Sequence, residues 1–349
     1  MKIALLTKKV KPEWLDYVKA LEKNLKNEGH EFLITAAPED VRNIEILIAD
    51  YSYEKNEISQ LMDRNSNLKY ILSWITGVNH IDVKKADEKG IKVTSTKFNI
   101  DAVANYVNNM ILSIAMDFKS YDEKTRQGEF ASIRPTSTDP YGKTLGIIGL
   151  GSIGSLIAKQ AEHYKMNVLA IRRRPELGKN GLGSHVTLLG GDHPKKEWAG
   201  ADYRNALDYL LENSDFITVN IPLIKDGSLF QTHHLIGEEE FGKMKNGVYF
   251  INASRGGVVD DGALIKAIQD RKIAGAAIDV YENSGGKEDG LFYRLSDALA
   301  LAKNVWLTPH MAGTGPYCFK RRNEILMEQI KRISQGKEPI WIADPDLGY

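Results

Sequence analysis

The chain has 349 residues, and its 46 lysine and arginine residues balance 46 aspartate and glutamate residues, so the formal net charge is zero. Proteins that bind nucleic acid or acidic membranes usually have a basic surplus, so this balance argues against both kinds of partner. With one cysteine (Cys318), a short N-terminal apolar run and no stretch of roughly 18 apolar residues, the sequence predicts a cytoplasmic protein without disulfides or membrane spans.

Short apolar runs alternate with amphipathic stretches over the first 95 residues, which is typical of parallel strands joined by helices. Strands are expected at residues 3–6, 32–35, 44–49, 70–73 and 93–95, and helices at 13–26 and 57–63. Apolar side chains then recur every three or four positions from 101 to 121. This spacing predicts one long buried helix that bridges two domains.

A second alternating series begins at residue 144. It predicts strands at residues 145–148, 168–171, 216–219, 248–252, 275–279 and 305–307. Six strands separated by helices match a doubly wound dinucleotide-binding domain. The last helix, about 317–335, lies beyond this series and is expected to return to the first domain.

The sequence therefore predicts two domains. Residues 1–100 and 315–349 are expected to form a substrate-binding domain, and residues 101–314 a dinucleotide-binding domain. Residues 176–201 are rich in glycine, have little periodicity and are long for a connection between two elements. We interpret them as a surface insertion, with a hairpin around residues 186–189.

The segment from Gly149 to Gly154 matches the pattern G-x-G-x-x-G between an expected strand and an expected helix that begins with Ser152 and Ile153. In that setting, Gly149 permits a tight turn, Gly151 lets a pyrophosphate approach the backbone, and Gly154 permits close packing of helix on strand. The alternatives are a turn without a ligand and an adenosylmethionine pocket.

The end of the second strand of this domain selects the cofactor. A site for NAD places an aspartate or glutamate roughly 20 residues after the first glycine, where it accepts the ribose hydroxyls. Here that position holds Arg172, followed by Arg173 and Arg174. Guanidinium groups bind a 2′-phosphate with charge-assisted hydrogen bonds, so we favour NADP over NAD. Three exposed arginines without a ligand are the alternative.

Three further segments follow in order: residues 252–260 (NASRGGVVD), 275–282 (GAAIDVYE) and 308–310 (TPH). Together with the glycine turn, they resemble the D-isomer-specific 2-hydroxyacid dehydrogenase family over nearly the whole chain. The resemblance implies an α/β protein of two Rossmann-like doubly wound domains, with the active site in the cleft between them. It also implies a homodimer built through the helix at 101–121.

Reduction of a 2-keto acid requires a hydride donor, a cation for the carboxylate and a proton donor for the nascent alkoxide. The resemblance implies that Arg255 holds the carboxylate and polarises the carbonyl, and that His310 donates the proton. Histidine suits the second role because it titrates near neutral pH. A structural ion pair and a core histidine are the alternatives. The sequence thus predicts an NADP(H)-dependent D-2-hydroxyacid dehydrogenase, acting mainly as a reductase of small 2-keto acids.

Members of the family pair this histidine with a glutamate, typically five residues after the aspartate that matches Asp279. That position here is Ser284, which departs from the pattern. A four-residue insertion would place Glu288 in the role. We favour Glu288 over Ser284, with Glu282 as a third choice.

Residues 73–82 resemble the family's substrate loop. The resemblance places the backbone N–H groups of Thr76 and Gly77 on the substrate carboxylate, and it places Trp74, Ile75 and Phe98 around the substrate side chain. Trp74 and Phe98 could equally be core aromatics. The sequence does not select one 2-keto acid.

The resemblance also supplies further cofactor contacts. They are Ile221 and Pro222 near the adenosine, Ala253 and Asp279 near the nicotinamide, and Gly313 after the histidine. Asp279 could equally cap a turn.

No metal site is expected, because His233–His234 and Asp192–His193 lack a third and a fourth ligand at metal spacing. The rival function is a dinucleotide-sensing binding protein on the same fold, as in the related corepressors. Retention of Arg255 and His310 speaks only partly against it.

Overall fold

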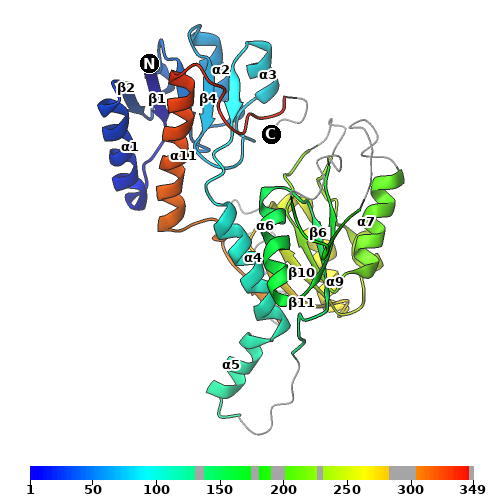
Figure 1. Cartoon of the computed structure of the whole chain (residues 1–349). Helices are drawn as coiled ribbons and strands as arrows, with labels where there is room; N and C mark the ends of the chain where they lie inside the picture. Colours follow the sequence, from blue (N-terminus) through cyan, green and yellow to red (C-terminus); the bar gives the residue numbers. More distant parts are fainter. Residues whose placement is uncertain (130–136, 174–180, 190–200, 226–230, 283–303, 346–349) are drawn as a thin grey trace. The chain divides into compact units, whose positions relative to one another are not determined.

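The computed structural model describes residues 1–129, 137–173, 181–189, 201–225, 231–282 and 304–345. The chain forms two compact units (Figure 1). Met1–Asn99 and Thr314–Tyr349 make the first unit, and Ile100–Gly313 make the second. Among the described residues, no helix is both long enough and apolar enough to span a membrane.

The first unit contains a five-stranded parallel sheet in the order β2-β1-β3-β4-β5. The strands are β1 (Lys2–Leu6), β2 (Glu31–Thr35), β3 (Ile46–Ala49), β4 (Tyr70–Ser73) and β5 (Lys92–Thr94). All five confirm strands expected from the sequence. Buried on both faces, β1 and β3 read as continuous apolar runs.

Helices cover both faces of this sheet (Figure 1). They are α1 (Leu15–Asn27), α2 (Lys55–Arg64), α3 (Val83–Glu88) and α11 (Pro316–Ser334). The apolar stripes of α1 and α11 pack together on one face, where Leu21 and Leu25 meet Leu326 and Ile330 in one buried cluster. The C-terminal helix therefore completes the core of the N-terminal segment.

The second unit contains a seven-stranded parallel sheet in the order β12-β11-β10-β9-β6-β7-β8. Its strands are β6 (Thr144–Ile148), β7 (Asn167–Ile171), β8 (Val186–Leu189), β9 (Phe216–Val219), β10 (Val248–Asn252), β11 (Ile273–Ile278) and β12 (Val305–Leu307). The chain starts at the central strand β6, builds outward to β8, and then returns to β9 on the other side. This reversal beside β6 is the topological switch point of a Rossmann fold.

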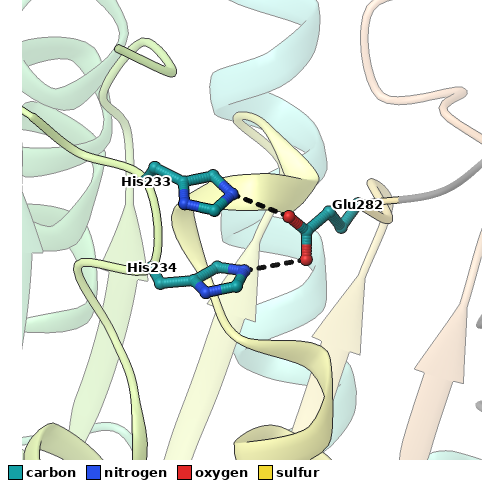
Figure 2. Close-up of side chains that lie close together, drawn as sticks. All are labelled: His233, His234 and Glu282. Atoms are coloured by element: carbon teal, nitrogen blue, oxygen red, sulfur yellow. Dashed lines mark hydrogen bonds and ion pairs between the residues drawn. The ribbon is translucent and has the colours of Figure 1, made fainter. Parts of the chain in front are cut away.

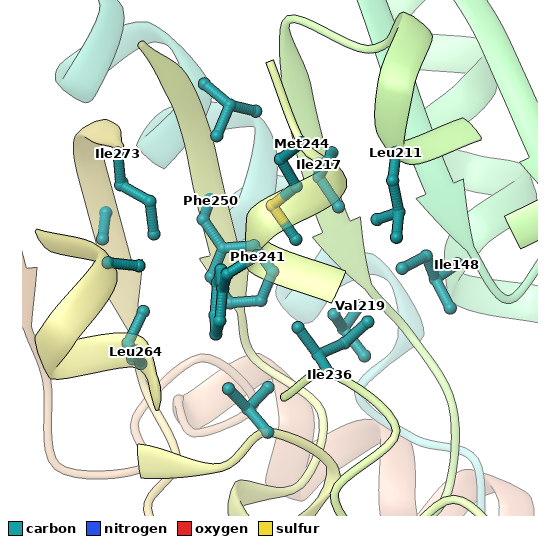
Figure 3. Close-up of a cluster of buried hydrophobic side chains, with 14 of the residues drawn as sticks. Ile148, Leu211, Ile217, Val219, Ile236, Phe241, Met244, Phe250, Leu264 and Ile273 are labelled. Carbon is teal, nitrogen blue, oxygen red and sulfur yellow. The ribbon is translucent and has the colours of Figure 1, made fainter. Parts of the chain in front are cut away.

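The faces of the second sheet are also covered by helices. They are α4 (Ile100–Ala115), α6 (Ser152–Ala161), α7 (Ala201–Asn213), α8 (Glu238–Lys243) and α9 (Asp261–Gln269). A further helix, α5 (Phe118–Arg126), follows α4 and belongs to neither buried cluster of this sheet. α4 and α6 share one buried cluster with the sheet, and α7, α8 and α9 share the other. Figure 3 shows the second cluster, in which Phe241 of α8 meets Phe250 of β10 edge to face at 5.3 Å between ring centroids.

Two expectations about this unit were wrong. Val186–Leu189 is not part of a hairpin, because β8 pairs in parallel with β7 and Val186 is buried in the core. The sheet therefore extends into the segment that we interpreted as an insertion; residues 176–180 and 190–200 lie outside the described residues. The expected single helix from 101 to 121 is divided into α4 and α5 at Asp117, whose left-handed backbone (φ 51°) interrupts the helical path.

Candidate active site

The glycine turn joins β6 to α6. Gly149 has φ +106°, and a Cβ there would lie 2.6 Å from the Asn220 carbonyl oxygen, so only glycine fits. A Cβ on Gly154 would lie 2.1 Å from the Gly149 carbonyl oxygen, which reflects the close packing of α6 on the turn. A Cβ on Gly151 would meet nothing within 4 Å. The turn therefore leaves open space above its second glycine, at the N-terminus of α6, where an anion is favoured.

The two described arginines after β7 lie beside this turn. The N–H groups of Gly149 and Leu150 both donate to the Ile171 carbonyl oxygen at 3.0 Å, and Arg172 is the next residue along the chain. Arg172 and Arg173 are half-buried. Arg174 lies outside the described residues. The carboxyl end of β7 thus holds cationic side chains where an NAD site would hold a carboxylate.

Asp279, directly after β11, holds the loop that contains His310. Its Oδ1 accepts hydrogen bonds from Thr308 Oγ1 at 2.6 Å and from the Met311 N–H at 2.7 Å, and its Oδ2 accepts from the Ala312 N–H at 2.9 Å. Asp279 is fully buried. Its carboxylate therefore holds a turn. Of the two roles that the sequence left open for Asp279, this is the turn cap and not the nicotinamide contact.

Two tyrosines that the sequence analysis did not select support the same loop. Thr308 donates to Asp279, so the 2.6 Å contact between Tyr106 and Thr308 has the tyrosine as donor. Tyr281 Oη donates to the carbonyl oxygens of Ile278 and Thr308 at 3.0 and 3.1 Å. Burial raises the pKa of Tyr106 to about 12, so it stays protonated and can donate. No short sequence pattern links these side chains, because they come from three separate segments.

His310 adopts a left-handed backbone (φ 56°), and its N–H donates to the Asp279 carbonyl oxygen at 2.8 Å. Its side chain reaches solvent, yet the surrounding protein and the positive charge of Arg255 hold the pKa of His310 below its usual 6.5, while the Asp279 charge opposes them. Arg255 follows β10 and precedes the short 3-10 helix η6 (Gly256–Val258). The two residues expected to be catalytic are therefore within electrostatic reach of each other.

The guanidinium of Arg255 donates from Nη1 to the Ser254 carbonyl oxygen at 2.7 Å, and the Arg255 carbonyl oxygen accepts from Asn252 Nδ2 at 3.2 Å. Burial lowers the pKa of the guanidinium, because the cation has lost part of its hydration. Gly256 lies so close to the backbone of Tyr281 that a Cβ would overlap it at 1.9 Å. This contact fixes the chain directly after Arg255 against the end of β11.

In the first unit, the predicted substrate loop follows β4. Thr76 Oγ1 donates to Asn99 Oδ1 at 2.7 Å, and Ser95 Oγ donates to the Thr76 carbonyl oxygen at 2.6 Å, so the loop is held from both sides. Within the part of the chain that the structure describes, the adjacent backbone N–H groups of Thr76 and Gly77 have no acceptor. Both residues are half-buried. Two neighbouring backbone N–H donors of this kind can bind a carboxylate.

The two aromatics expected around the substrate side chain are largely buried. Trp74 is 1% exposed, and the guanidinium of Arg322 lies 3.7 Å from the centroid of one of its rings. Phe98 is 8% exposed and lies 5.7 Å from the same guanidinium. This placement corresponds to the core-aromatic alternative. Ile75, half-buried at the edge of the core, remains available to line a pocket.

Arg322 itself was missed from the sequence, because an arginine in an amphipathic helix is expected on the solvent face. It is 1% exposed, and burial lowers its pKa to about 9. Its Nε and Nη2 atoms have no hydrogen-bond partner among the described residues. Aromatic faces stabilise the cation instead, at a cost in desolvation.

The remaining predicted cofactor residues lie at or near the carboxyl ends of the strands in the second unit. Ile221 packs against Gly149, and the Pro222 carbonyl oxygen accepts from Thr232 Oγ1 at 2.7 Å. Ala253 directly follows β10, Gly313 follows the His310 turn, and Ser152 and Ile153 open α6. The carboxyl edge of a doubly wound sheet is where such folds bind their ligands.

Among the described residues, no carboxylate forms an ion pair with the His310 side chain. Glu288 and Ser284 both lie in the segment 283–303, outside the described residues. The third choice, Glu282 as the acid that pairs with His310, is wrong. Its two carboxylate oxygens accept hydrogen bonds from His233 and His234.

Comparison with known proteins identifies the family. Residues 109–312 match the family model of the D-isomer specific 2-hydroxyacid dehydrogenase NAD binding domain. A protein of Staphylococcus haemolyticus that has a provisional 2-hydroxyacid dehydrogenase name is 34% identical over 313 residues, 88% of this chain and 87% of the relative.

Solved structures share the fold over almost the whole chain. A D-lactate dehydrogenase from Aquifex aeolicus, complexed with NAD and lactic acid, is 26% identical with a TM-score of 0.74 and 96% coverage of each chain. A glyoxylate reductase from Paecilomyes thermophila is 23% identical, with a TM-score of 0.75 and 98% coverage of each chain. The chain therefore belongs to the D-isomer specific 2-hydroxyacid dehydrogenase family and is an NAD(P)-dependent oxidoreductase.

Proposed function

We propose that this protein is an NADP(H)-dependent D-2-hydroxyacid dehydrogenase that acts mainly as a reductase of small 2-keto acids. The observation that supports this most strongly is the electrostatic coupling of Arg255 to His310 on a loop that Asp279 holds in place. A cation beside an imidazole meets the two demands of ketone reduction, polarisation of the carbonyl and delivery of a proton.

The glycine turn fits a dinucleotide. The open space at Gly151 and the N-terminus of α6 suit a pyrophosphate. Ile221, which packs against Gly149, and Pro222 after it would contact the adenosine. Arg172, Arg173 and Arg174 would hold a 2′-phosphate. When bound, the nicotinamide supplies the hydride for the keto carbon.

The chain's own groups supply the rest of the chemistry. In the first unit, the N–H groups of Thr76 and Gly77 bind the substrate carboxylate, and Ile75 contacts its side chain. In the second unit, Arg255 polarises the keto oxygen and His310 donates its proton to the nascent alkoxide. We assign Asp279 to positioning the His310 loop, since its oxygens hold that turn. Glu288 is proposed to stabilise protonated His310.

The test of cofactor choice is kcat/KM for NADPH and NADH with a panel of 2-keto acids, in the wild type and Arg172→Asp. A charge-assisted hydrogen bond contributes about 1.5–3 kcal/mol, so the substitution should lower the NADPH preference about 10- to 100-fold. Arg271→Asp is the matched control, since Arg271 is exposed and precedes β11 at the amino edge of the sheet.

A wild-type preference for NADH, or an unchanged preference in Arg172→Asp, would contradict the assignment to NADP. Tight NADPH binding without turnover of any keto acid would instead support a dinucleotide sensor.

We also propose that the protein is a homodimer. Light scattering at micromolar concentration should give twice the mass of the 39.1 kDa chain, and a monomer would refute the proposal. The cytoplasmic location expected from the sequence stays a prediction.

A further inference from the structure

The second unit contains a cluster of two histidines and one glutamate that the proposed reaction does not use. Figure 2 shows His233 and His234 on one side and Glu282 on the other. The Nε2 atom of each histidine lies 2.8 Å from a different oxygen of the Glu282 carboxylate. The histidines lie in the connection between β9 and α8, and Glu282 follows β11, 48 residues from His234. The fold therefore supplies the third ligand that the sequence did not show.

The backbone places the imidazoles of His233 and His234 on the same side of the chain. Side chains of adjacent residues point to opposite sides of an extended chain. Here His234 has a left-handed backbone (φ 50°), and the two rings stack with centroids 3.9 Å apart and planes at 20°. The N–H of His234 donates to the Gly257 carbonyl oxygen at 2.9 Å, which ties the pair to the segment after Arg255. The two nitrogens are therefore held in place before any ligand binds.

We propose that His233, His234 and Glu282 bind one divalent transition-metal ion of the zinc class. One ligand atom from each residue lies within 4.8 Å of the others. Tetrahedral ligands at about 2.0–2.1 Å from zinc lie about 3.3 Å apart, so small side-chain rotations bring the atoms onto one ion. The ion replaces the hydrogen bonds that now join each imidazole to the carboxylate, and water completes its coordination.

The donor set selects the class of ion. Two imidazole nitrogens with one carboxylate suit zinc, cobalt and nickel, whereas magnesium and calcium prefer oxygen ligands alone. Nearby charge adds to the attraction, because Asp260 and Asp261 bring two more carboxylates beside the cluster. Asp260 Oδ2 lies 3.8 Å from His234 Nδ1, the position of the outer carboxylate that orients a metal-bound histidine.

The cluster is open to ions in solution. The side chains of His233, His234 and Glu282 are 28%, 38% and 23% exposed, so an ion reaches them without unfolding of the protein. The competing account is a metal-free network in which Glu282 only joins two histidines. Binding measurements separate the two accounts, and they do so whether or not the proposed dehydrogenase reaction is correct.

The experiment uses the full chain without an affinity tag, treated with a chelator and then freed of it. Titration with Co²⁺ should give visible d–d absorption that saturates at one ion per chain, and Zn²⁺ should displace it. Calorimetry with Zn²⁺ should give a dissociation constant in the micromolar range or tighter.

His234→Ala and Glu282→Gln should each weaken binding at least 100-fold, while circular dichroism shows that both variants are folded. Asp260→Asn should weaken it about tenfold, as loss of an outer-shell partner does. The matched control is His163→Ala, which removes an exposed histidine of the short helix η3 (Glu162–Tyr164) in the same unit and should leave binding unchanged.

Absence of saturable Co²⁺ binding in the wild type at millimolar ion would overturn the proposal. Equal affinity in the wild type, His234→Ala and Glu282→Gln would also overturn it, because the ion would then bind elsewhere.

Discussion

Two glycines of the same turn should respond differently to one added methyl group. In Gly154→Ala the new Cβ would lie 2.1 Å from the Gly149 carbonyl oxygen, and this backbone atom cannot rotate away. Overpacking of this kind costs about 3 kcal/mol, and the better helix propensity of alanine returns about 1 kcal/mol. The net loss of about 2 kcal/mol should lower the melting temperature of a unit of about 200 residues by about 4–8 °C.

Gly151→Ala places its methyl group in open space, so the folded chain tolerates it. Because Gly151 is the N-cap residue of α6, the substitution should lower the free energy of unfolding by about 0.5–1 kcal/mol and the melting temperature by about 1–4 °C. The methyl group would occupy the proposed site of the pyrophosphate, so NADPH affinity should fall at least about tenfold, a loss of about 1.4 kcal/mol.

The assays are thermal unfolding followed by circular dichroism and NADPH binding followed by fluorescence or calorimetry. The two variants add the same atoms to the same turn, so each is the control for the other. Wild-type NADPH affinity in Gly151→Ala would refute the placement of the pyrophosphate. An unchanged melting temperature in Gly154→Ala would refute the close packing of α6 on the turn.

Two further predictions concern the His310 loop. In Glu288→Gln, ketone reduction should fall off at a lower pH than in the wild type, because burial and Arg255 lower the pKa of His310 and only Asp279 then opposes them. Ser284→Ala is the control. Identical pH–rate profiles in the wild type and Glu288→Gln would remove Glu288 from the mechanism. Thr308→Val removes the hydroxyl between Tyr106 and Asp279, so kcat should fall and stability should drop by about 1–3 kcal/mol. Unchanged kcat and unfolding curves would show that this bridge does not position His310.

Elements whose patterns are local could be predicted well. The continuous apolar run of β10 and the helical spacing in α1 each depend on a few neighbouring residues, and both lie where the sequence predicts. The glycine turn is also local, because the tight turn and the close approach of helix and strand restrict which residue types fit. The motifs that identify the family are also short local patterns, so they could be recognised in the sequence.

Elements that depend on distant partners could not be predicted. The sequence predicted a hairpin around Val186–Leu189, but this segment is a parallel strand of the sheet because the edge of β7 lies beside it. The break at Asp117 interrupts a pattern that by itself favours a continuous helix. Local preference is weak compared with tertiary packing, so packing decided both cases.

The sequence by itself determined the α/β class, the dinucleotide turn and the family, since each follows from residue types at fixed spacing. Only the tertiary structure decided which side chains meet. It buried Arg322 against Trp74, joined Asp279 to the His310 loop, and brought Glu282 to two histidines 48 and 49 residues away. Parallel strands adjacent in a sheet are separated in sequence by whole helices. The groups that meet at their carboxyl ends therefore have no fixed spacing along the chain.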